Sequence, residues 1–335
     1  MGEAHRTRSS VTEVLNRWGY KKLAEEAEAE QRSLVTGVPS AGGALFAGGF
    51  LNELIELQRN QVVTRQIPGI RVINMPNGTM EIKKHTAAAT AAYSQEASPI
   101  ASSQQSFGSI TLTGKKLTAL TPVSNDLLRV ADASADAIVR DDLAQVMALR
   151  EDLAFLYGSG ASGQPRGIRY AVDSAMGVNT GGATAALVRV DLINAMQRMA
   201  SRNVAFNPGN AAWLMSERSK YRLMGIVNAL DLPAFPEVAQ GMLMGYKILS
   251  TNQIADTFST DKSEVLFVCG SEVVIGDVRG LELTALDGAA YYNSPTSAVV
   301  SGFSNDETAI RAIAVHDIGL RHDNGLSVIQ VVAWA

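Results

Sequence analysis

Two histidines, His316 and His322, are the side chains whose type is best suited to hold a metal ion. They share one face of a predicted strand. A rise of about 3.3 Å per residue places them roughly 20 Å apart, which is too far for both to bind one ion. We therefore predict no metal site and expect both histidines to be solvated or structural.

Three glycines at positions 158, 160 and 163 fit the spacing GxGxxG of dinucleotide-binding loops. In such loops the glycines follow a strand and open a helix, so that the helix N-terminus binds the pyrophosphate. Here they follow a predicted helix and open no βαβ unit. The GxxxxGK[ST] phosphate loop and the G-x-S-x-G elbow do not occur in the sequence. We predict no bound cofactor.

The remaining residues that could take part in catalysis are better explained by a structural role. Asp141 and Asp142 are neighbours on a predicted helix, so their carboxylates point in different directions and form no acid–base pair. Cys269 ends an apolar run over residues 265–269, which is typical of a buried and unreactive thiol. We predict no catalytic residue and no enzymatic activity.

The composition favours a soluble protein made and used in the cytoplasm. At roughly 150 residues per domain, 335 residues suggest about two domains. The 29 basic and 33 acidic residues give no overall positive field to attract nucleic acid. A single cysteine forms no intrachain disulfide, and no apolar run approaches the roughly 18 residues that span a bilayer, so no membrane contact is expected.

The elements that must position any functional surface begin with one long amphipathic helix before Gly158. Its start can be capped by Asp132 or Ser134, and the glycine can end it. Apolar residues recur at helical spacing, and charged residues fill the other faces. The apolar set is Ile138, Val139, Leu143, Val146, Met147, Leu153 and Leu156, and the charged set is Arg140, Asp141, Asp142, Arg150, Glu151 and Asp152.

A long hairpin is predicted before this helix. Residues 80–83 and 109–112 alternate as short strands, and the segment between them, 85–107, is almost entirely Ala, Thr, Ser and Gln. Such a hairpin is marginally stable by itself, so we expect it to lie on another subunit. The apolar positions change parity at Gly114, which indicates a bulge or bend there.

The C-terminal half mixes helices and strands, which indicates an α+β fold. A helix is predicted over residues 187–202 with Leu192, Ile193, Met196 and Met199 on one face, and another over 217–227. Strands are predicted at 211–215, 246–250, 265–269, 272–275, 281–286, 308–320 and 326–334.

Several segments carry a resemblance to a known family. The long helix closes with Tyr157-Gly158-Ser159-Gly160, followed by Gln164-Pro165-Arg166-Gly167-Ile168. The segments 207–215, 244–251 and 274–283 then follow in matching order. This arrangement resembles the major capsid proteins of tailed phages, which have the Hong Kong 97-type fold. The resemblance covers roughly residue 42 to the C-terminus.

The resemblance implies a division of the chain. Residues 1–45 would form an N-terminal arm, 46–76 would lead into the body, and 77–112 would be the extended loop, or E-loop, that overlaps a neighbour. Residues 113–185 would form the peripheral domain with its spine helix, 186–292 the axial domain, and 293–335 the strands that return to the peripheral domain.

Inter-subunit contacts are expected at the arm and the loop. The apolar stripe of the arm would anchor it on a neighbour, through Val11, Val14, Leu15 and Trp18. In and after the loop, the expected contact residues are Tyr93, Glu96, Gln105, Phe107, Lys115 and Lys116.

The implied function is mechanical. Copies would assemble as pentamers and hexamers into the icosahedral head of a tailed phage, in the virion, after assembly in the host cytoplasm. The expected partners are a separate scaffolding protein, a portal at one vertex, a decoration protein and packaged double-stranded DNA bound without sequence specificity. Only about forty residues precede the body, which favours separate scaffolding and no cleavage of this chain.

Some shells of this family crosslink a loop lysine to an asparagine, with a glutamate as base. The lysine position matches Gln105, and the glutamate position falls near Ile313 or Ala314. None of these can do that chemistry, so we expect a shell without isopeptide bonds. Two alternatives stay open: an encapsulin-type compartment, which would hold protein cargo, and a soluble α/β enzyme, which would form a small oligomer with a ligand pocket.

Overall fold

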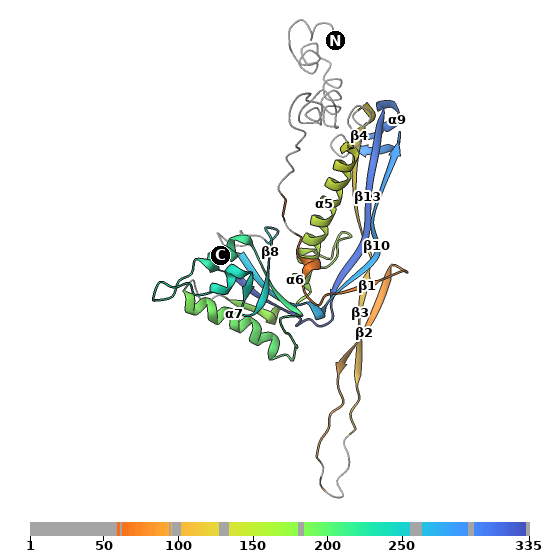
Figure 1. The fold of residues 1–335 in the computed structure, drawn as a ribbon. Coiled ribbons are helices and arrows are strands. Elements are labelled where there is room, and N and C mark those ends of the chain that lie inside the picture. Colours follow the sequence, from red (N-terminus) through yellow and green to blue (C-terminus); the bar gives the residue numbers. More distant parts are fainter. Residues whose placement is uncertain are drawn as a thin grey trace, which may run out of the picture. The chain divides into compact units, whose positions relative to one another are not determined.

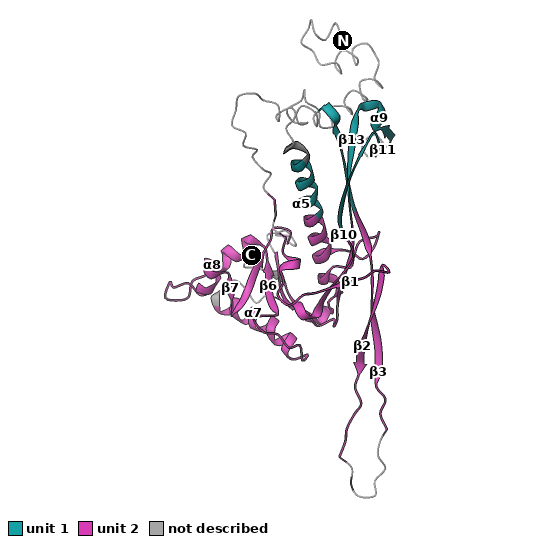
Figure 2. Cartoon of the chain, turned by 45° about the vertical axis from the view of Figure 1, so that its right-hand side comes forward, with its two compact units in different colours: residues 1–57, 118–147, 281–313 teal, residues 58–117, 148–280, 314–335 magenta. Residues whose placement is uncertain are grey.

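The computed structural model describes residues 59–332 apart from 61, 94, 96–101, 127–133, 180–183, 255–262 and 294–297. The chain forms two compact units, which are described separately here (Figure 2). In the described part, unit 1 holds Thr118–Met147 and Leu281–Ile313. Unit 2 holds the rest, within Gln58–Leu117, Ala148–Gly280 and Ala314–Ala335.

Unit 2 is built on a sheet with the strand order β5-β14-β9-β6-β8-β7. The strands are β5 (Gly177–Asn179), β6 (Ala211–Met215), β7 (Met242–Leu243), β8 (Tyr246–Ser250), β9 (Ser263–Cys269) and β14 (Leu326–Val332). Every residue of β6 is buried. Both edge strands, β5 and β7, are short, which limits the unpaired backbone open to other chains.

Each face of this sheet has its own core, because successive side chains of a strand point to opposite faces. On one face, Trp213 and Phe267 pack with helix α7 (Ala185–Ala200). On the other face, Leu214 and Leu266 pack with Phe155 from the end of helix α5 (Ser134–Tyr157). Shorter elements complete the unit: α6 (Ile168–Ala171), α8 (Glu217–Met224), η3 (Thr64–Gln66), η4 (Ser174–Met176), η5 (Pro236–Gln240) and η6 (Gly270–Glu272).

A second sheet has the order β1-β10-β13-β4. Its strands are β1 (Arg71–Asn74), β4 (Lys115–Ser124), β10 (Val273–Asp287) and β13 (Glu307–Leu320) (Figure 1). In unit 2, β1 pairs in parallel with β10, with Arg71 opposite Val274. In unit 1, Val123, Leu143 and Ile310 form a small core. Unit 1 also holds α9 (Gly302–Asn305) and the antiparallel pair β11 (Ala290–Asn293) and β12 (Ala298–Ser301).

The structure corrects one expectation about strands and shows where the last strand pairs. The strands predicted at 272–275 and 281–286 are one continuous strand, β10. Its glycine at 276 is an inner position, where a Cβ would meet the Met75 side chain at 2.5 Å. The last predicted strand, 326–334, is β14, which pairs with β9 and β5. Its side chains alternate between the two cores of unit 2, so it is an interior strand of that sheet.

Two helices also differ in detail from the prediction. In α7 the buried apolar positions are Val188, Leu192, Ala195 and Met199, whereas Ile193 is exposed. In α5, Ser134 is the first helical residue, Val146 is exposed and Asp152 is buried. The helix ends at Tyr157 as predicted, and Gly158 is required there because a Cβ would lie 2.2 Å from the Pro165 carbonyl oxygen. In the described residues no helix is long and apolar enough to cross a membrane.

Candidate inter-subunit contact surfaces

The predicted hairpin consists of β2 (Thr79–Ala87) and β3 (Ser106–Thr113), which pair antiparallel. At its base, Ile82 lies opposite Ile110 and Met80 opposite Leu112. Leu112 is buried in a small core with Met75 and Val274, against which Met80 and Ile82 pack. The base of the hairpin is therefore anchored in unit 2.

The outer part of the hairpin has no such support. From His85 to Phe107 every described residue is exposed, so neither face of the ribbon is covered. Tyr93 is 109% exposed and Phe107 is 66% exposed. The ring of His85 contacts the ring of Phe107 edge-on, with 4.4 Å between centroids. These aromatic side chains have little to pack against within the chain.

Hydrogen bonds keep the two arms of the hairpin together in this exposed part. The hydroxyls of Thr86 and Ser106 are 2.8 Å apart. Farther out, the backbone N–H of Thr90 donates to the Ser103 hydroxyl oxygen at 3.0 Å. The arms therefore run side by side well beyond the apolar base.

The hairpin root is fixed by Asp317 and Gly114. The Asp317 carboxylate accepts hydrogen bonds from the N–H of Thr113 at 2.7 Å and of Ile318 at 3.0 Å. Burial raises the pKa of Asp317, although these hydrogen bonds and Lys115 act in the opposite direction. A Cβ on Gly114 would lie 2.6 Å from Val278 and 2.9 Å from Val315. The inward-facing positions change parity here, as predicted. They are even-numbered before the glycine, as at Ile110 and Leu112, and odd-numbered after it.

The predicted contact residues have different outcomes. Val11, Val14, Leu15, Trp18 and Glu96 lie outside the described residues. Tyr93, Gln105 and Phe107 are exposed on the hairpin as expected. Lys115 and Lys116 lie at the root, at the start of β4, with Lys115 half-buried and Lys116 exposed. The structure thus does not gather these residues into one patch. Ile313 and Ala314, at the position of the family's glutamate, are buried in β13.

A charged cluster that the sequence reasoning missed joins η3 to α5 and β10. Arg65 donates to Glu151 at 2.7 Å and makes two hydrogen bonds to Asp277, at 2.9 and 3.1 Å. The buried Asp152 carboxylate accepts from the backbone N–H of Thr64 at 2.6 Å and of Val63 at 3.2 Å. Burial raises the pKa of Asp152, and the hydrogen bonds from Thr64 and Val63 oppose that change. No local signal marks these contacts, since the partners are far apart in sequence.

The two histidines lie in different surroundings. His316 is buried in β13, with its ring edge-on to Phe155 at 4.9 Å. Burial, and then the positive charge of Arg65, lower its pKa to about 4. Glu151, 3.8 Å away, would favour protonation, but burial dominates and His316 is neutral at pH 7. The prediction that His322 shares its strand face is wrong, because β13 ends at Leu320; His322 contacts Glu272 at 2.7 Å.

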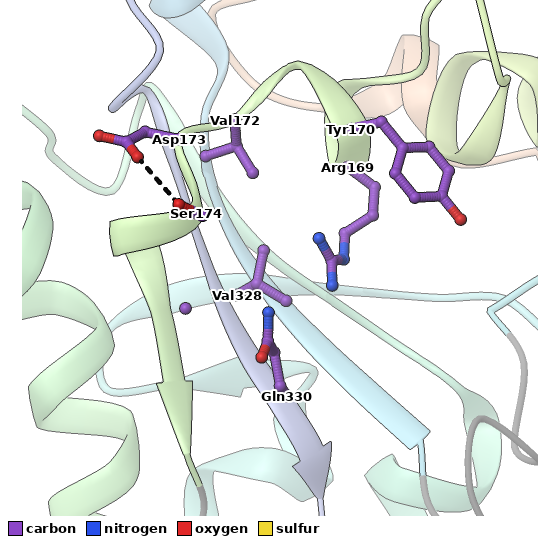
Figure 3. Close-up of a pocket in the computed structure, with 8 residues that line it drawn as sticks. Arg169, Tyr170, Val172, Asp173, Ser174, Val328 and Gln330 are labelled. Atoms are coloured by element: carbon purple, nitrogen blue, oxygen red, sulfur yellow. Dashed lines mark hydrogen bonds between the residues drawn. The ribbon is translucent and has the colours of Figure 1, made fainter.

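The glycine loop and the cavity beside it give no arrangement suited to catalysis. Gly160 and Gly163 follow α5, as predicted, and have positive φ angles. A cavity of about 180 Å³ is lined by Arg169, Tyr170, Val172, Asp173, Ser174, Gly177, Val328 and Gln330 (Figure 3). Its charges are paired, Arg169 with Glu264 at 2.7 Å and Asp173 with Arg202 at 3.0 Å. In the described residues no three potential metal ligands cluster.

Comparisons with known proteins identify what the chain resembles. The profile of the phage capsid family matches residues 42–331. A major capsid protein of Klebsiella oxytoca phage phiKO2 is 30% identical over 299 residues, which cover 85% of this chain and 67% of that protein. A structure from Mycobacterium phage Adephagia has a TM-score of 0.70 at 16% identity and covers 87% of this chain and 97% of that one. The capsid of an empty GTA particle has a TM-score of 0.63 at 18% identity, over 90% and 100% of the two chains.

Proposed function

This chain belongs to the phage capsid family, and from that premise we propose that its copies assemble as pentamers and hexamers into the icosahedral head of a tailed phage. It is a phage major capsid protein, a component of the virion, and its role is structural. The expected Hong Kong 97-type fold is confirmed by the likeness to tailed-phage capsid structures. The division into arm, E-loop, peripheral domain and axial domain is part of the proposal.

The exposed hairpin carries this proposal. A two-stranded ribbon is at best marginally stable in water without a surface to cover one of its faces. At the described residues between His85 and Phe107 both faces are open, yet the base is anchored through Leu112 and Asp317. A firmly rooted ribbon with an uncovered outer part is suited to lie on a neighbouring copy. In a closed shell every copy repeats that contact, so modest contacts add up.

Assembly into a phage head implies further partners. We propose a separate scaffolding protein during assembly, a portal at one vertex, a decoration protein and double-stranded DNA as the content, with assembly in the host cytoplasm. With a net charge of −4 the chain has no overall positive field to attract DNA, so the shell would enclose DNA without binding it strongly. Mass spectrometry and nucleic-acid analysis of purified particles test this. Protein cargo in place of DNA would favour an encapsulin-type compartment instead.

We further propose that the shell is held without catalysis or isopeptide bonds. Gln105 has no amine to attack a neighbour, and Ile313 and Ala314 cannot accept a proton. Boiled particles should therefore give a single band near 35.6 kDa on a denaturing gel. A ladder of covalent oligomers under reducing conditions would contradict this part of the proposal.

The proposed function is tested by shortening the hairpin. In the variant, Asn-Gly replaces residues 86–106, which joins the paired residues His85 and Phe107 by a two-residue turn suited to a hairpin. Because the anchored base is kept, the subunit should stay folded and soluble. Because the overlap is lost, electron microscopy should show no closed shells.

The unmodified chain, purified and assembled in parallel, is the control. Thermal unfolding of both proteins by circular dichroism checks that the shortened subunit keeps its fold. Normal shells from a folded, shortened subunit would refute the role given to the hairpin.

A further inference from the structure

Helix α7 carries large aliphatic side chains on two opposite sides. One side packs into the core of unit 2 through Val188, Leu192, Ala195 and Met199. On the other side, Leu187, Val190 and Ile193 follow one another at three-residue steps and are 40%, 50% and 48% exposed. We call these three residues the α7 outer face. A helix that is apolar on both sides normally has a second partner.

The α7 outer face also lacks the charges that keep a solvated helix surface in water. Between residues 186 and 197, the other side chains on this side are Ala186, Asn194 and Gln197, all uncharged. Arg189 and Arg198 flank it and donate to backbone carbonyl oxygens, those of Ala234 at 3.1 Å and Ala175 at 2.6 Å. Covering this face would therefore cost little desolvation of charge.

A second exposed apolar feature of unit 2 has a fixed shape. It is the loop of residues 227–233 after α8, which we call the leucine loop. Val227 and Pro233 bridge its ends. Within it, the side-chain oxygen of Asn228 accepts from the N–H of Leu230 at 2.8 Å and of Leu232 at 3.1 Å. The loop is therefore ordered by its own hydrogen bonds.

The leucine loop presents its apolar side chains to solvent. Leu230 is 78% exposed and Leu232 is 57% exposed. The segment after α8 protrudes from unit 2 (Figure 2). Because the loop is already ordered, a partner that binds it does not have to offset the cost of ordering it. Two exposed leucines on an ordered protrusion are suited to enter an apolar surface.

We propose that the leucine loop of one copy packs on the α7 outer face of the next copy in a ring of subunits. The inference rests on the proposed assembly and names a contact within it. A ring is closed by heterologous contacts, in which two different surfaces of one subunit meet on adjacent copies. The leucine loop and the α7 outer face are two such surfaces on one unit.

Charge at the rim supports the same partner. Asp231, an acidic residue, lies between the two leucines of the loop, with a positive φ of 55°. Arg189 and Arg198 flank the α7 outer face. An apolar centre with opposite charges around it is the usual arrangement of a specific protein contact.

Paired cysteines test the contact directly. Shells are assembled from the double variant Leu230→Cys with Ile193→Cys. They are then oxidised and analysed on a non-reducing denaturing gel. The native Cys269 is buried, so it should not form these crosslinks. We expect a ladder of covalent oligomers that a reducing agent removes. Each single variant, and Leu230→Cys combined with Lys247→Cys on the exposed side of β8, should give no ladder.

The outcomes separate this inference from the proposed function. Normal shells without a ladder would overturn the inference and leave the shell role intact. Failure of the unmodified chain to form any shells when it is expressed together with the proposed scaffolding protein would instead overturn the proposed function.

A charge exchange gives a second test if the cysteine variant assembles poorly. Leu230→Asp and Val190→Lys should each lower the yield of shells by about tenfold or more, as expected for central interface residues. Circular dichroism should be unchanged, since both residues are exposed. The combined variant should recover most of the yield. Unchanged yield in the single variants, or no recovery in the combined one, would contradict the contact.

Discussion

At the scale of single residues, the most informative side chain is Asp152. Its position among charged neighbours on an amphipathic helix predicts a solvated side chain, but it is 1% exposed. Its carboxylate accepts the N–H groups of Val63 and Thr64, which lie at the start of η3, the first described element of the chain. A buried carboxylate in such a place serves to hold a distant backbone segment against the helix.

We predict that Asp152→Ala destabilises the isolated subunit. The change leaves two buried N–H groups without an acceptor, which costs about 1–3 kcal/mol. Urea unfolding followed by circular dichroism measures the loss. The matched control is Asp141→Ala on the exposed side of the same helix, which should change the free energy of unfolding by less than about 0.5 kcal/mol. Equal effects of the two changes would mean that the Asp152 contacts contribute nothing.

The side-chain placements that sequence reasoning missed share a cause. Helical spacing separates an apolar from a polar side, but it does not show which polar residue meets a distant backbone segment, as Asp152 does. It also does not show which apolar residue is left for a partner. Ile193 is predicted on the inner side of α7 with Leu192, Met196 and Met199, but in the structure it is exposed on the other side of the helix.

At the scale of elements, the hairpin and the long helix were well predicted. Alternation over residues 80–83 and 109–112 is visible in the sequence because the base of the hairpin has one covered face. The continuity of β10 was missed. Glycines at 276 and 280 resemble strand ends, yet Gly276 makes room for Met75. Glycine marks a close approach as often as a turn, and spacing alone does not separate the two.

The change of parity at Gly114 gives a prediction at this scale. Gly114→Ala would place a methyl group against Val278 and Val315, so we expect the hairpin root to be destabilised by about 1–3 kcal/mol. The matched control is Gly280→Ala in β10, since no atom lies within 4 Å of the Cβ it would add. Urea unfolding of the two variants should differ by that amount, with shell yield lower for Gly114→Ala. Indistinguishable unfolding curves would contradict the packing described for the root.

At the scale of the whole molecule, the sequence supports the family through the order of its elements more than through any single motif. The α+β content and the Hong Kong 97-type fold could be predicted because the helix, its glycine loop and the later strands follow in order. The sheet to which β14 belongs could not be predicted. Several strands of the chain are similarly apolar, so the sequence does not show that β14 pairs with β9. The arm, with Trp18, lies outside the described residues, and its contact with a neighbour stays a prediction.

At this scale, the surfaces that we propose for assembly are those that the described residues leave uncovered. The outer hairpin, the α7 outer face and the leucine loop all expose apolar side chains while their bases are well packed. A monomer in water gains nothing from such surfaces, whereas a repeating assembly covers each of them in every copy. Assembly is therefore the physical reason for the parts of this chain that its own core does not explain.

The most direct test of this account is electron cryomicroscopy of particles assembled from the chain together with the proposed scaffolding protein. We predict closed icosahedral shells in which the hairpin from His85 to Phe107 lies along the surface of an adjacent copy, with the exposed face of Phe107 covered. Small soluble oligomers in place of shells, or shells in which the hairpin extends into solvent without touching a neighbour, would contradict it.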